Sequence, residues 1–132
     1  MTNYREDERV SMMANYSQEE MARYVDMEAG LARLRGNQKL YNRMLKLFLA
    51  ATEFPAFEEN LAQGDLAKAA DVAHAIKGIT GNLSLTLLFE LSTRLMHELR
   101  EGKCDEAVIA EYRDAYKKTV EIATDIVNSE GA

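Results

Sequence analysis

Four consecutive stretches of this chain place apolar side chains three or four residues apart, and short polar turns separate these stretches. The spacing matches the 3.6-residue turn of an α-helix, so each stretch predicts a helix with one apolar face. No stretch alternates apolar and polar residues as a half-buried β-strand would. Helices joined by short turns bury their apolar faces against one another, which predicts an all-α fold, an antiparallel up-and-down four-helix bundle.

An additional short N-terminal helical segment is expected to begin at Ser17, which has the spacing of a capping box with Glu20. This segment, of one or two short helices, should end at residues 35–37 and lie across one end of the bundle. Residues 1–16 are polar and irregular, and we interpret them as a flexible arm. The remaining residues, 17–132, are assigned to one bundle domain.

Caps and turns set the expected limits of the four bundle helices. Asn37 can cap the first, which should continue to the turn at residues 63–65. Pro55 lies inside this first helix and should kink it near residues 51–52 rather than end it. Asp65 should cap the second helix. The last three helices are expected over about residues 66–80, 85–100 and 105–128.

Composition excludes several classes of protein. The net charge of −6 argues against a nucleic-acid-binding protein, because such a protein needs a basic face. No apolar stretch approaches the roughly 20 residues of a membrane span, and residues 1–9 lack the apolar core of a signal peptide. Cys104 is the only cysteine, so no internal disulfide can form. We therefore expect a cytoplasmic protein.

His74 is the polar residue whose surroundings are most unusual. With about 100° per residue, Gly81 falls within roughly 20° of His74 around the helix, and Ala70 and Gly78 fall within about 40°. Lys77 lies at about 60°. The imidazole should therefore be exposed among small and charged neighbours. The opposite side is apolar and should face the core: Leu66, Ala69, Val72, Ile76, Ile79 and Leu83.

The glycines beside His74 need an explanation, because each glycine destabilises a helix by about 1 kcal/mol relative to alanine. Missing side chains at Gly78 and Gly81 would let a partner surface approach the ring. The Lys77 cation disfavours a second positive charge nearby, which leaves a ring nitrogen free as a nucleophile. The same cation could neutralise a bound phosphoryl group. The alternative is a surface histidine without a role, with Gly78 serving helix packing and Gly81 a helix cap.

These residues resemble a known signature. The likeness is to histidine-containing phosphotransfer (HPt) domains of bacterial phosphorelays, in the runs His74-Ala75-Ile76-Lys77-Gly78 and Gly81-Asn82-Leu83. The resemblance extends to the part of the domain that precedes the histidine helix. There the matching residues are 26–34, 40–41, 47–48 and 64–65. The resemblance covers about residues 24–128 and implies a helical bundle with a site centred on His74.

The resemblance implies a phosphorelay intermediate. Nε2 of His74 would attack an aspartyl phosphate on a receiver domain and later pass the group to another receiver aspartate. Lys77 would stabilise charge on the transferring group, and Gly78 would let the receiver close over the ring. Such transfer depends mostly on positioning and electrostatics.

The implied partners are response-regulator receiver domains and a hybrid sensor kinase, without nucleic acid or membrane. Magnesium would belong to the receiver domain, so this chain should need no cofactor of its own. No carboxylate cluster or phosphate-binding loop for ATP is present in the sequence, so we expect no intrinsic kinase activity. The chain should be a monomer, and its initial methionine and compact length favour a free protein over a fragment of a hybrid kinase.

One position departs from the family pattern. Members often carry Gln or Glu twenty-two residues after the histidine, where the side chain can orient the imidazole, and here that residue is Met96. The ring must then be oriented in another way or more loosely. Arg100, one turn later, resembles a basic residue that some members place near the phosphorylated site, and a solvated arginine is the alternative.

The expected docking surface for a receiver domain is a strip of α-helix around the histidine, made of Ala67, Ala70, His74, Gly78 and Gly81. The N-terminal helix could add apolar contacts to this strip, from Met21, Tyr24 and Val25.

Two alternatives compete with phosphotransfer. Asp71 and His74 have the spacing of a carboxylate–histidine metal pair, but a di-metal bundle needs a second such motif. The only other histidine, His97, has Arg94 in the corresponding position, so no metal site is expected. The second alternative is a helical adaptor that binds a signalling partner through the His74 face without being phosphorylated. An adaptor has no need of a nucleophile at the centre of its binding surface.

Overall fold

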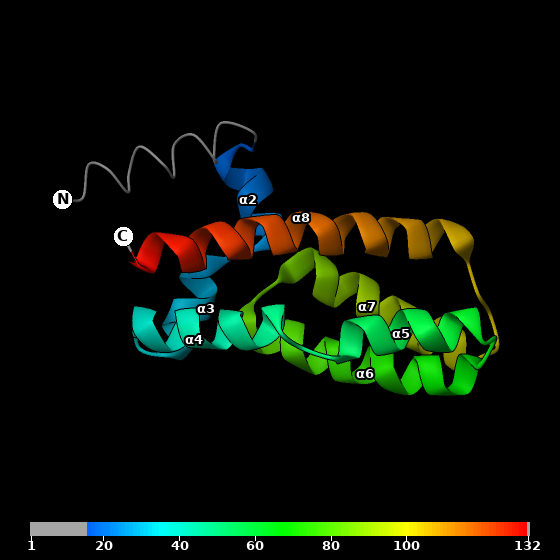
Figure 1. Cartoon of the computed structure of the whole chain (residues 1–132). Helices are drawn as coiled ribbons and strands as arrows, with labels where there is room; N and C mark the ends of the chain where they lie inside the picture. The colour runs from blue at the N-terminus through cyan, green and yellow to red at the C-terminus, as the bar shows by residue number, and fades with distance from the viewer. Residues whose placement is uncertain (1–15, 132) are drawn as a thin grey trace.

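The computed structural model describes residues 16–131, which form seven helices and no strand (Figure 1). The helices are α2 (Gln18–Tyr24), α3 (Met27–Arg33), α4 (Gln38–Leu49), α5 (Glu53–Ala62), α6 (Leu66–Leu83), α7 (Thr86–Arg100) and α8 (Glu106–Gly131). The bundle has four helical positions: α4 and α5 together occupy the first, and α6, α7 and α8 occupy the others. The contacts are α4 with α8, α5 with α6, α6 with α7, and α7 with α8. The predicted all-α four-helix bundle is confirmed.

The N-terminal segment has the caps that the sequence predicts. The Ser17 side chain accepts from the backbone N–H of Glu20, and the Glu20 carboxylate accepts from the N–H of Ser17. Figure 1 shows α3 at the end of the bundle where α4 begins and α8 ends. Of the predicted arm, residues 1–15 lie outside the described residues. Tyr16 packs edge-on against Tyr24, with ring centroids 5.8 Å apart.

The first bundle helix is not continuous, so the prediction of a single kinked helix is wrong. Residues 50–52 separate α4 from α5, and Pro55 is the third residue of α5. The proline ring would collide with the Ala51 carbonyl if the helix ran through it. In the first turn of a new helix the same proline is tolerated, because the N–H groups there have no intrahelical acceptor. The chain therefore stops and restarts.

The second bundle helix, α6, runs three residues beyond the expected end near Thr80. It continues through the Gly81–Asn82 pair to Leu83 and is closed by Ser84 in the left-handed conformation, with φ of 59°. Asp65 caps its N-terminus as predicted, accepting from the Lys68 N–H.

Tertiary hydrogen bonds explain why α6 extends that far. The last carbonyls of a helix lack intrahelical donors. Here the Arg33 guanidinium donates to the Gly81 carbonyl, and the Tyr41 hydroxyl donates to the Leu83 carbonyl at 2.8 Å. The Asp26 N–H donates to the Ser84 carbonyl at 2.9 Å. The N-terminal helices and α4 thus hold the end of the helix that carries His74.

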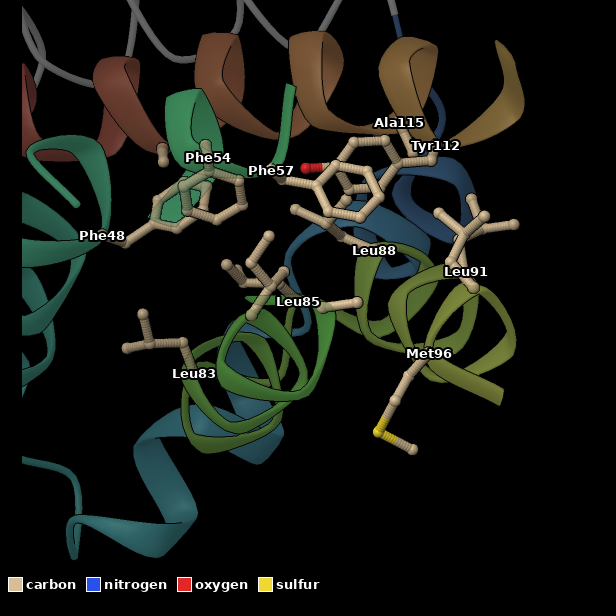
Figure 2. Close-up of a cluster of buried hydrophobic side chains, with 14 of the residues drawn as sticks. Phe48, Phe54, Phe57, Leu83, Leu85, Leu88, Leu91, Met96, Tyr112 and Ala115 are labelled. Carbon is tan, nitrogen blue, oxygen red and sulfur yellow. The ribbon is translucent and has the colours of Figure 1, made fainter. Parts of the chain in front are cut away.

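The core fills the space between α8 and the other bundle helices. The predicted apolar stripe of α8 is buried along its length: Val108, Tyr112, Ala115, Thr119, Ile122 and Ile126. Figure 2 shows the rings of Phe54, Phe57 and Tyr112 close together beside α8. Phe57 and Tyr112 pack edge-on, with centroids 5.1 Å apart. Such aromatic pairs contribute beyond the area they bury.

The buried face of α6 is turned toward α7 relative to the expected apolar side. Leu66, Val72 and Ile79 are only partly buried, whereas the fully buried set is Ala69, Ala70, Ala73, Ile76, Thr80 and Leu83. Ala70 has no exposed surface. The prediction that Ala70 lies on an exposed docking strip is therefore wrong, because α7 packs on that flank of α6.

Candidate functional site

His74 lies in the middle of α6 with its imidazole exposed. Its Nδ1 is 3.2 Å from the Sδ of Met96, a buried residue of α7. The position that lacks the family's usual polar residue therefore still contacts the ring. Nε2, on the other side of the imidazole, is the nitrogen left for a partner.

The register of the α6–α7 hairpin decides which residues face His74. The two helices are antiparallel and joined by the tight connection at Ser84 and Leu85. His74 and Met96 each lie eleven residues from Leu85. Because both helices rise about 1.5 Å per residue, residues equally distant from the turn lie opposite each other. The short turn, rather than local sequence, brings the sulfur to the ring.

The two glycines near His74 have different surroundings. A Cβ atom on Gly78 would meet nothing within 4 Å, so this exposed glycine serves no packing within the chain. A Cβ atom on Gly81 would lie 3.1 Å from two ring carbons of Phe89. Gly81 thus accommodates an α7 side chain, and because α6 continues past it, Gly81 is not a helix cap. Only Gly78 is left bare toward solvent.

A shallow surface pocket surrounds the exposed face of the imidazole. Six residues line it: His74, Lys77, Gly78, Gly81, Asn82 and Phe89. No carboxylate in the described part of the chain pairs with Lys77, so its ammonium can interact with an anion placed against the ring. An exposed imidazole, a cation and an open glycine therefore meet in one hollow.

Phe89 is a pocket residue that the sequence analysis missed, and Asn82, although part of the signature run, was not singled out as a site residue. Phe89 precedes Met96 by seven residues, so the two lie on the same face of α7. Placing that face against α6 requires the hairpin register, and the register follows only once α6 is known to end at Leu83. The spacing of Phe89 and Met96 could have indicated this, but using it required the correct end of α6, which the sequence analysis placed too early in the chain.

A comparison with protein families bears on this site. The model of the Hpt domain family matches residues 43–122, more than half of the chain. The chain belongs to the Hpt domain family. The matched region runs from α4 into α8 and contains the whole His74 pocket. No match was found among curated proteins or among solved structures. Hpt domains carry out histidine phosphotransfer in phosphorelays, and they interact with receiver domains or kinases.

Arg100 of this Hpt domain lies at the margin of the site and does not line the pocket. Its Nη2 is 4.0 Å from Oδ1 of Asp71, one helical turn before His74 on α6. The side chains are 49% and 79% exposed, so the ion pair contributes little to stability. It does keep the guanidinium on the α6 side of α7. Asp71 thus has a cationic partner in Arg100.

The N-terminal helix of the Hpt domain does not extend the pocket. Val25 is buried, and Met21 lines a separate hollow between α2, α3 and α8. The suggested docking contacts of Met21, Tyr24 and Val25 are therefore absent from the His74 pocket.

The described side chains of residues 16–129 include no group of three or more His, Cys, Asp or Glu arranged to bind a metal ion. Among the helices of residues 16–131, none has the length and apolar character to cross a membrane.

Proposed function

We propose that His74 is the phospho-accepting residue of this Hpt domain. The Nε2 lone pair attacks the phosphorus of an aspartyl phosphate on a receiver domain, the bond from phosphorus to the carboxylate oxygen breaks, and the aspartate leaves as a carboxylate. A second receiver aspartate then takes the phosphoryl group from Nε2. The observation that carries the proposal is the exposed imidazole beside an open Gly78 and beside Lys77, which has no ion-pair partner among the described residues.

The roles of the neighbouring residues follow from the chemistry of phosphoryl transfer. Charge spreads over the equatorial oxygens of the transferring group, and a nearby cation stabilises it. Lys77 supplies that cation, since its side chain lines the pocket. The bare surface at Gly78 lets the receiver approach closely enough to align its aspartate with Nε2. Magnesium is held by the receiver, and this chain uses no cofactor and no ATP.

The proposed partners are response-regulator receiver domains and a hybrid sensor kinase. Docking covers His74, Gly78 and Gly81, with Arg100 at the margin. We place the reaction in the cytoplasm and assign it to a monomer. The exposed lone Cys104, which cannot form an internal disulfide, is in keeping with a reducing compartment.

The test is transfer from a receiver domain phosphorylated with labelled phosphate. We expect the label to move to this chain, to resist alkali and to be lost in acid, as a phosphohistidine would. His74→Gln should abolish the transfer. His97→Gln is the matched control, because His97 is the only other histidine and is exposed on α7 outside the pocket. No transfer from any receiver would instead favour the adaptor. Equal labelling of His74→Gln would show that a residue other than His74 accepts the phosphoryl group.

A further inference from the structure

The contact between Met96 and His74 is the one feature of the site that neither the signature nor the charge pattern explains. Met96 is 3% exposed and lies on α7, while its sulfur reaches to 3.2 Å from Nδ1 of the imidazole. Figure 2 shows the Met96 side chain extending from α7 away from the rings of Phe57 and Tyr112. The thioether therefore leaves the aromatic core and ends at the site.

We propose that Met96 is a positioning residue, whose thioether accepts a hydrogen bond from Nδ1–H and holds the ring with an unprotonated Nε2 directed to the pocket. A thioether sulfur has no hydrogen to donate and is only an acceptor. The ring nitrogen that faces the sulfur must carry the hydrogen for the contact to be attractive. In the neutral ring the other nitrogen, Nε2, then keeps its lone pair.

This choice of tautomer matters for the proposed reaction, on which the inference rests. Only an unprotonated nitrogen can form the bond to phosphorus, and Nε2 is the nitrogen that a receiver can reach. A neutral side chain free to rotate would exchange between two tautomers, and one of them carries its hydrogen on Nε2. Acceptance by sulfur disfavours that unreactive form without adding a charge next to the phosphoryl group.

The packing around Met96 explains how a flexible side chain can act as a fixed acceptor. Methionine has three rotatable bonds and usually adapts to its surroundings. Here its neighbours on α7, Leu95 and Leu99, are also buried, and Ser92 one turn earlier is 1% exposed. The Met96 side chain thus leaves α7 among residues that are themselves buried. The hairpin register then sets His74 directly across from it.

The first test measures the tautomer of His74 by ¹⁵N NMR at a pH where the ring is neutral. In the unmodified domain we expect hydrogen on Nδ1 and a bare Nε2. Met96→Leu keeps the volume but removes the acceptor, so the population with hydrogen on Nε2 should increase. Met96→Gln restores an acceptor through its amide oxygen and should restore the Nδ1–H form. Met27→Leu is the control, a partly buried methionine that lies outside the pocket.

The second test measures transfer from a phosphorylated receiver domain to the same variants. Met96→Leu should slow transfer by about two- to tenfold, the factor that one neutral hydrogen bond typically represents. Met96→Gln and Met27→Leu should stay within about twofold of the unmodified rate on the same basis. A purely structural role for Met96 would leave the tautomer unchanged in Met96→Leu.

The two tests separate failure of this inference from failure of the proposed function. Hydrogen on Nε2 in the unmodified domain, or an unchanged tautomer and rate in Met96→Leu, overturns the role of Met96 while phosphotransfer stands. A tautomer shift in Met96→Leu, combined with no phosphorylation of the domain by any receiver, supports the role of Met96 and contradicts phosphotransfer.

Discussion

Gly78 is a glycine in the middle of a helix at a place where nothing in the chain requires one. Its absent side chain faces open space beside His74. Gly78→Gln should therefore fold normally, yet place a side chain between the ring and a docked receiver. We expect transfer to slow by at least about tenfold, because small displacements of reacting groups cost rate steeply. Ala110→Gln, on the exposed face of α8, is the control and should transfer normally.

The measurement for Gly78→Gln is the initial rate of labelling by a phosphorylated receiver, alongside thermal unfolding to verify the fold. Transfer at the unmodified rate would show that the receiver does not approach over Gly78, and the close-approach argument would then be wrong.

Lys77 is the cation that lines the pocket, and its charge should matter more than its bulk. Lys77→Gln should slow transfer by about ten- to a hundredfold, since a charged group acting on a transferring phosphoryl group typically contributes a few kcal/mol. Lys68→Gln is the matched control. Lys68 is an exposed lysine of α6 that lies outside the pocket, with its Nζ 4.0 Å from Oδ2 of Asp65. Single-turnover rates of both variants test this, and equal rates would remove Lys77 from the mechanism.

At the scale of the helices, the sequence predicted what depends on neighbours in the chain. The caps at Ser17, Asn37 and Asp65 form as expected, because capping is a local hydrogen bond. The buried stripe of α8 also follows from spacing alone. The break before Pro55 was misjudged because a kink and a restart have the same local pattern. The end of α6 was misjudged because its carbonyls are satisfied by distant donors, among them Arg33.

The residues of the site also fall into two groups, those that the local sequence predicts and those that depend on contacts between helices. His74, Lys77 and Gly78 lie within five residues, so one helical turn brings them together and sequence alone predicts them. Phe89 and Met96 belong to another helix, and their place at the ring depends on where the hairpin turns. The burial of Ala70 likewise depends on which flank of α6 faces α7. Contacts between helices are the part that local patterns leave open.

Gly30 is tightly surrounded, whereas Gly78 faces open space, so the same change to alanine should affect stability differently at the two glycines. A Cβ atom at Gly30 would lie 2.5 Å from a ring carbon of Tyr41 and 3.2 Å from the Leu83 carbonyl oxygen. Tyr41 is fully buried and cannot move aside cheaply. Gly30→Ala should therefore destabilise the domain by about 1–3 kcal/mol, as overpacking does. Gly78→Ala should stabilise it by about 0.5–1 kcal/mol through helix propensity alone.

Urea denaturation of the two alanine variants measures both effects. The free energies of unfolding should change in opposite directions. A Gly30→Ala variant as stable as the unmodified domain would show that α3 can shift away from Tyr41, and that the contact does not fix the N-terminal helices on the end of α6.

At the scale of the whole molecule, two buried phenols should make the stability of the core depend on pH. Tyr41 joins α4 to the end of α6, and Tyr112 packs from α8 against Phe57 of α5. Burial raises the pKa of both phenols, and nearby carboxylates, Asp26 for Tyr41 and Glu58 for Tyr112, raise it further. In the unfolded chain each phenol returns to its ordinary pKa near 10. Only the unfolded chain then loses these protons as the pH rises through about 10.

The free energy of unfolding should therefore be independent of these phenols below about pH 10 and fall above it. Each phenol contributes a slope of up to about 1.4 kcal/mol per pH unit, because the folded state retains a proton that the unfolded state releases. Tyr112→Phe keeps the ring and removes one titrating group, so its slope should be shallower by that amount. Urea denaturation between about pH 8 and pH 11 measures both slopes. Equal slopes would mean that Tyr112 ionises in the folded domain, and that its surroundings are more hydrated than its contact with Phe57 indicates.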